Sequence, residues 1–156
     1  MVTRADPVEL APREVARLAI LDLRSLNSPG PGDFAIAAGL LSIAQDLAPN
    51  DADIVRRRAE AAYNAGDNAV VDECTKRIVE LDPADTVAQL RYITSRIGAY
   101  QTAEDRLAAY DALVGPKGAA LDESIRSRLA LDAALLARER GDTAGFIDRL
   151  KKAISL

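Results

Sequence analysis

The chain has 156 residues, enough for one domain, and its net charge of −4 argues against nucleic-acid binding, which needs a concentrated positive field. It contains no histidine and one cysteine, so it lacks the commonest general base and the side chains for an ordinary zinc site. We therefore expect no enzymatic activity, no metal and no cofactor. Aromatic residues make up only 4%, so the core should consist mostly of Ala, Leu, Ile and Val, which suits closely packed helices.

The beginning of the chain predicts a loose segment followed by a helix. Residues 1–11 contain three charged residues, a proline and no continuous apolar run, and we expect them to be flexible. Pro12 can open a helix, because its missing N–H is not needed there, and this helix should run to about Leu26. One face of it carries apolar side chains, namely Val15, Ala19, Leu23 and Leu26. Residues 27–32 include two prolines and two glycines, which predict a turn rather than helix.

The later helices are marked by acidic caps and by chain breaks. Asp33, Asp67 and Asp142 each follow a glycine, and we expect their carboxylates to accept hydrogen bonds from free N–H groups as N-caps. A helix follows Asp33, and further helices are expected over 52–65, 67–81, 85–97, 100–113, 121–140 and 143–156. Residues 115–118 (Gly-Pro-Lys-Gly) break the chain before the longest of these helices. Its apolar stripe consists of Ile125, Leu129, Ala133 and Leu136.

One helical unit recurs along the chain. Four glycines are each followed by a leucine fifteen residues later, namely Gly32 and Leu47, Gly66 and Leu81, Gly98 and Leu113, and Gly141 and Leu156. The positions five, nine and twelve residues after each glycine are mostly apolar and fall on one face of a helix. The first two glycines are 34 residues apart, as are Pro49 and Pro83, which should stand just past helix ends. A recurrence of this length predicts a solenoid of stacked helix pairs.

The second unit resembles a tetratricopeptide repeat. It carries the small residue of the family's first helix, the turn glycine and the closing Leu-Asp-Pro, at Ala59, Ala62-Tyr63, Ala65-Gly66-Asp67 and 78–83. The resemblance covers about residues 30–156. It implies an all-α fold, a right-handed superhelical solenoid of about eight helices in four antiparallel pairs.

The implied organisation is a single domain over residues 12–156. Its four units would span 12–49, 50–83, 84–116 and 119–156. The chain departs from the family where Val71 and Phe146 replace an alanine, and where Val55 replaces a tryptophan. An ordinary helical bundle with fortuitously aligned leucines and alanines is the alternative.

The resemblance also implies a binding groove lined by the first helix of each pair. The residues expected to face this groove are Asp53, Arg56, Glu60, Tyr63, Asn64, Ala88, Tyr92, Ser95, Arg96, Leu131, Leu135 and Arg138. Among them we predict partner binding by Arg56, Glu60, Tyr63, Asn64, Tyr92 and Arg96, because tyrosine and arginine combine large contact area with directional donors. For Tyr63, packing between repeats is an equal alternative. Some family members bind a chaperone carboxylate here, but Glu60 would repel one, and only Arg56 could hold it.

Two other features are read as structural. The basic run Arg56-Arg57-Arg58 is followed by Glu60 and preceded by two aspartates, which predicts a solvated helix face with local ion pairs. Cys74 lies on the apolar stripe of its helix, which predicts a buried and inert thiol.

These observations favour a non-catalytic protein–protein interaction scaffold that binds a peptide or partner protein. The alternatives are a homo-oligomeric assembly module, self-associating through an exposed C-terminal face, or a regulatory or targeting segment of a larger enzyme. The sequence shows no signal peptide and no membrane span, so we expect no membrane insertion and a cytoplasmic location. The motif stops at Leu156, where the second unit continues with Asp-Pro, so we also expect the chain to be part of a longer protein.

Overall fold

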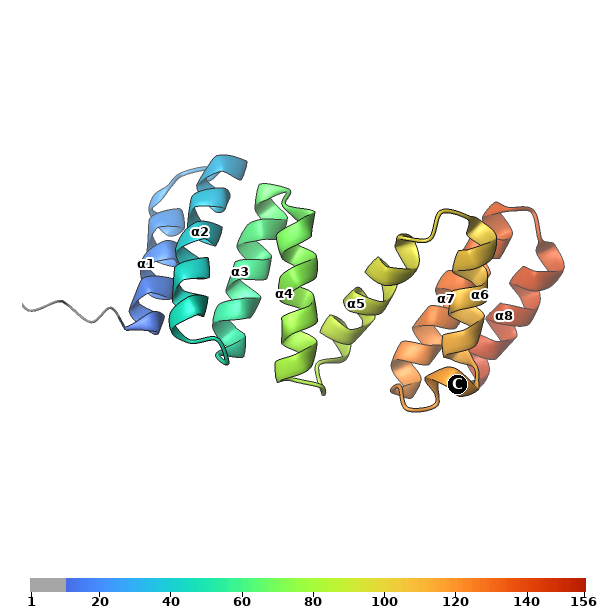
Figure 1. The fold of residues 1–156 in the computed structure, drawn as a ribbon. Coiled ribbons are helices and arrows are strands. Elements are labelled where there is room, and N and C mark those ends of the chain that lie inside the picture. The colour runs from blue at the N-terminus through green and yellow to red at the C-terminus, as the bar shows by residue number, and fades with distance from the viewer. Residues whose placement is uncertain (1–10) are drawn as a thin grey trace, which may run out of the picture. The chain divides into compact units, whose positions relative to one another are not determined.

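The computed structural model describes residues 11–156, and this part of the chain is all-α, with no strand (Figure 1). The predicted flexible segment, residues 1–11, lies outside the described residues except for Ala11. The chain divides after Pro83 into two compact units. The first unit contains α1 (Pro12–Ser25), α2 (Pro31–Leu47), α3 (Ala52–Ala65) and α4 (Asn68–Leu81). The second contains α5 (Thr86–Gly98), α6 (Ala103–Val114), the short 3-10 helix η1 (Pro116–Gly118), α7 (Glu123–Glu139) and α8 (Thr143–Ser155).

In the first unit each helix packs against the next one along the chain, and neighbours run antiparallel (Figure 1). The core between α1, α2 and α3 is made of small and medium apolar side chains, and Ala19, Leu41 and Ala44 have no exposed surface. The many alanines let the helix backbones approach one another closely. Cys74 on α4 is fully buried, which confirms its predicted burial, and desolvation raises the pKa of its thiol.

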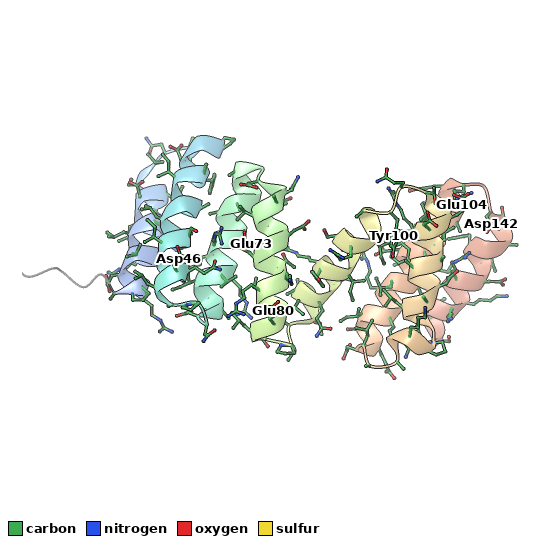
Figure 2. All side chains as sticks on the ribbon, in the orientation of Figure 1. Asp46, Glu73, Glu80, Tyr100, Glu104 and Asp142 are labelled. Carbon is green, nitrogen blue, oxygen red and sulfur yellow. The ribbon has the colours of Figure 1, made fainter. Side chains whose placement is uncertain are left out.

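The second unit is built around α7. This helix packs against both α6 and α8, and its stripe residues Ile125, Leu129 and Ala133 are buried as predicted. Two ion pairs join the elements of this unit: Arg149 of α8 binds Asp111 of α6 at 2.7 Å, and Arg140 at the end of α7 pairs with Glu104. Glu104 lies at the start of α6 (Figure 2), and the hydrogen bond from Arg140 lowers its pKa to about 2. By contrast, α5 contacts α6 and α7 at only a few residues.

Two of the helix turns have the same structure, one in each unit. Gly66 and Gly141 are the only described residues with a left-handed backbone, at φ 80° and 77°, which glycine adopts without strain. The aspartate after each glycine caps the next helix, as predicted: Asp67 accepts from the N–H of Val70, and Asp142 from the N–H of Gly145. The turn from α3 to α4 is therefore repeated between α7 and α8.

The other two glycines of the predicted column have a different role, because Gly32 lies inside α2 and Gly98 is the last residue of α5. The prediction that Asp33 is an N-cap is wrong. The N-cap of α2 is Gly30, whose N–H donates to the Asp33 carboxylate at 2.8 Å. The predicted turn over 27–32 is too long by two residues, since Pro31 occupies the first helical position, where its missing N–H costs nothing.

The remaining differences are small. The helix expected from residue 100 begins at Ala103 because Thr102 caps it, so Tyr100 lies in the preceding loop. Leu26 lies past the end of α1 and is 40% exposed, so it is not part of the apolar stripe. The residues five, nine and twelve positions after Gly32, Gly66, Gly98 and Gly141 are all buried or half-buried, in agreement with one helix face that points toward the core in each repeat. The helices also end before Pro49 and Pro83, as predicted.

Candidate binding pockets

The second unit contains an open pocket between α5 and α6. Its volume is about 580 Å³, and we call it the α5–α6 pocket. It is lined by Tyr92, Ile93, Arg96, Ile97, Ala99, Tyr100, Ala109, Ala112 and Leu113. Two of the six residues predicted to bind a partner, Tyr92 and Arg96, thus lie on one pocket wall. Tyr100, which the prediction left out, belongs to the loop between the two helices (Figure 2).

Loose packing of α5 leaves room for this pocket. Only Ala88 and Ile97 of α5 are buried, and only Val114 of α6. On the α6 side the wall includes two alanines, Ala109 and Ala112, which do not fill the space between the helices. Ala88 was expected to face the groove, but it is 6% exposed, so this prediction is wrong.

Polar groups at the pocket have no competing partners inside the protein. The hydroxyls of Tyr92 and Tyr100 and the guanidinium of Arg96 make no hydrogen bond or ion pair with residues 11–156. The loop that carries Tyr100 is held in place, because the Nε of Arg106 donates to the carbonyl oxygen of Tyr100 at 2.8 Å. The pocket therefore combines an apolar lining with directional donors that are available to a ligand.

The other four predicted residues all lie on α3, in the first unit. Tyr63 is 70% exposed, so it does not pack within that unit, and Glu60 and Asn64 are exposed beside it. The Asn64 side chain donates to the backbone oxygen of Glu60 at 2.8 Å. Arg56 is half-buried and pairs at 2.7 Å with Asp82, which directly follows α4, and at 3.4 Å with Asp53.

The basic run on α3 is only partly explained by ion pairs. The pair between Arg56 and Asp53 is local, as predicted. Arg58 departs from the prediction, because its side chain is only 12% exposed and pairs with Glu73 of α4 at 3.0 Å rather than with a neighbour on α3. Arg57 has no such partner among the described residues. It lies instead at a second pocket, which the sequence did not predict.

This second pocket lies between α1 and α3 of the first unit and has a volume of about 490 Å³. We call it the arginine groove, and it is lined by Arg13, Ala16, Arg17, Ile20, Leu21, Arg24, Asp51, Asp53, Ile54 and Arg57. Arg13 donates to Asp51 at 3.0 Å. Burial acts to raise the pKa of Asp51, but the hydrogen bonds from Arg13 and from two backbone N–H groups outweigh it and lower this pKa.

Over residues 11–156, no three histidine, cysteine, aspartate or glutamate side chains gather in a way that could hold a metal ion. None of the helices in that range is both long enough and apolar enough to cross a membrane.

No protein-family model matches the chain, and no curated protein sequence is significantly similar to it. The likeness to the tetratricopeptide repeat therefore rests on the sequence alone, most fully on residues 50–83.

Proposed function

We propose that the chain is a non-catalytic protein-interaction module that binds a peptide segment of a partner protein in the α5–α6 pocket. The observation that carries this proposal is the composition of the pocket, in which two tyrosines and an arginine with unused donors surround an apolar lining. Tyrosine and arginine are enriched among the residues that dominate binding energy at protein interfaces. A volume of about 580 Å³ falls in the range of pockets that hold small ligands or single anchoring side chains.

The chemistry of the pocket defines the peptide that it suits. Ile93, Ile97 and Leu113 offer an apolar surface to an aliphatic or aromatic side chain of the partner. Around it, Tyr92, Tyr100 and Arg96 can donate to carbonyl oxygens of the partner's backbone. A pocket formed by helices that are already folded loses little conformational freedom on binding, which favours affinity.

We also propose that the helix pairs form a right-handed tetratricopeptide-like solenoid. Two observations support this architecture. The same turn occurs at Gly66 and Gly141, and the positions five, nine and twelve residues after the glycine are buried or half-buried in all four sequence repeats. In such a stack the exposed face of α3 would supply further contacts through Tyr63, Glu60 and Asn64. Arg56 would contribute less, because its guanidinium is already held by Asp53 and Asp82.

Selection from a random peptide display library tests the pocket. We expect enrichment of peptides that share one large apolar residue, and we expect their affinity to fall about tenfold or more in a Tyr92→Ala, Arg96→Ala double variant. The matched control is Val87→Ala, Arg91→Ala, which truncates two exposed side chains of the same helix, α5, outside the pocket. Equal affinity of the enriched peptides for the parent protein and for the pocket variant would contradict the proposal.

A second candidate function, assembly of identical copies, is favoured by an unusual face of α2. Ile36, Ile43 and Leu47 of this helix are 62%, 49% and 50% exposed, and the half-buried Leu40 lies between them. These positions follow the three- and four-residue spacing of one helix face. Exposed apolar residues in such a row indicate an interaction site rather than ordinary scatter.

Sedimentation measurements across a range of concentrations test this second candidate. If α2 joins copies, the parent protein sediments as a concentration-dependent oligomer, and Ile36→Lys, Ile43→Lys gives a monomer. The exposed pair Leu18→Lys, Val87→Lys is the control, because it adds the same charge elsewhere. A parent protein that is monomeric at every concentration would eliminate assembly as the function of this face.

A further inference from the structure

The arginine groove has a charge that is opposite to that of the whole chain. Four arginines and two aspartates line it, whereas the net charge of the chain is −4. Arg13, Arg17 and Arg24 project from one side of α1, and Arg13 and Arg24 stand about 16 Å apart along the helix axis. Arg57 stands on the other wall, on α3. The basic side chains therefore border the length of the groove.

The two aspartates do not neutralise this charge. Asp51 is occupied by Arg13 at 3.0 Å and by the first turn of α3, which it caps. Asp53 faces Arg56, which is not a lining residue, at 3.4 Å. Both acids are thus engaged away from Arg17, Arg24 and Arg57.

Those three arginines are available to a ligand. Arg24 and Arg57 form no ion pair with any described residue. Arg17 has only Glu14 at 3.9 Å, with both side chains about two-thirds exposed, and such surface pairs contribute almost nothing to stability. A planar guanidinium can bind a carboxylate with two parallel hydrogen bonds, so each arginine is a site for one acidic side chain.

The floor of the groove is apolar. Ala16 and Ile54 are buried beneath it, Ile20 is half-buried, and Leu21 is 47% exposed at its edge. A ligand that only carried negative charge would leave this surface in contact with water. A ligand with an apolar side chain between its charges would cover it and gain from the burial.

We propose that the arginine groove binds an acidic peptide segment that carries at least one large apolar residue among its aspartates or glutamates. The carboxylates bind Arg17, Arg24 and Arg57, and the apolar side chain covers Ile20, Leu21 and Ile54. This site is separate from the α5–α6 pocket, shares no residue with it, and does not depend on the function proposed for it.

Fluorescence anisotropy with a labelled synthetic peptide that repeats Glu-Leu-Glu tests the proposal on the full chain. The parent protein binds this peptide at least about ten times more tightly than a matched Gln-Leu-Gln peptide, and its affinity for the glutamate peptide falls as NaCl is added. The Arg24→Gln, Arg57→Gln variant, which lacks two of the groove's positive charges, binds the Glu-Leu-Glu peptide about tenfold more weakly than the parent protein does. Arg91→Gln, Lys151→Gln, which removes the same charge from exposed positions outside the groove, leaves it unchanged.

The apolar half of the proposal has its own variant. Leu21→Asn changes a side chain that is already half exposed, so the fold tolerates it, and it should weaken the Glu-Leu-Glu peptide about three- to tenfold. An all-glutamate peptide, which has no apolar side chain, should show no such loss. Circular dichroism confirms that each variant is folded.

Several results would overturn the proposal. One is equal affinity for the glutamate and glutamine peptides, which needs no variant to observe. Another is tight binding of a single-stranded DNA oligonucleotide that is lost in the Arg24→Gln, Arg57→Gln variant, since it would make the groove a nucleic-acid site. A Tyr92→Ala, Arg96→Ala variant keeps its affinity for the acidic peptide, so failure here is distinguishable from failure of the α5–α6 pocket.

Discussion

We expect Leu129→Ala to lower the free energy of unfolding by about 2–5 kcal/mol. Leu129 lies in the middle of α7 and has no exposed surface, and it belongs to the core cluster of the second unit with Ile97, Val114 and Ile125. Removing most of its side chain takes away buried apolar contact and leaves a cavity that helices already in contact with α7 can fill only in part. Chemical denaturation followed by circular dichroism measures the loss.

The matched control is Leu18→Ala. Leu18 lies on α1 and is 58% exposed, so the same truncation removes little buried surface and should change the free energy of unfolding by less than about 0.5 kcal/mol. Equal effects of the two substitutions would mean that α7 is not at the centre of a packed core.

A second large effect is expected for Gly118→Ala, at roughly 3 kcal/mol of destabilisation. Gly118 is the buried last residue of η1, between α6 and α7. A methyl group on it would overlap the backbone carbonyl of Leu113, and backbone atoms cannot rotate away as a side chain can. The segment that joins α6 to α7 would therefore have to move. The melting temperature and the unfolding free energy measure the cost.

Gly39→Ala provides a control of opposite sign. Gly39 lies inside α2, is exposed, and has open space where a methyl group would stand. Alanine loses less conformational freedom than glycine on entering a helix, so this change should stabilise the protein by about 0.5–1 kcal/mol. If both glycine substitutions gave the same result, the close approach of Gly118 to Leu113 would have no energetic consequence.

The helices could be predicted from the sequence because their signals are local. Apolar spacing shows which side of a helix is inside, prolines show where it cannot continue, and aspartates at 67 and 142 show where it begins. The error at Asp33 has the same origin. A glycine followed by an aspartate is a capping signal at Gly66, but at Gly32 the preceding Pro31 had already opened the helix.

The pockets could be predicted only in part, because they depend on distances between helices. The place of Tyr92 and Arg96 on one helix face predicts their role, whereas the sequence places Tyr100 in a helix and the structure places it in the loop before α6. The arginine groove joins Arg24 to Arg57, which are far apart in the sequence and carry no shared motif. The sequence also does not show which arginine of the run lacks a partner. Arg56 and Arg58 form ion pairs, whereas Arg57 forms none with any described residue.

The central claim, that the α5–α6 pocket binds a peptide segment, is tested most directly by nuclear magnetic resonance with the side chains of the pocket labelled. A display-selected peptide is added stepwise while the methyl signals of Ile93 and Leu113 and the ring signals of Tyr100 are followed. We predict that these signals shift and saturate together, while the methyl signals of Leu41 in the first unit stay in place. Saturable binding with no shift at the three pocket residues would contradict the account.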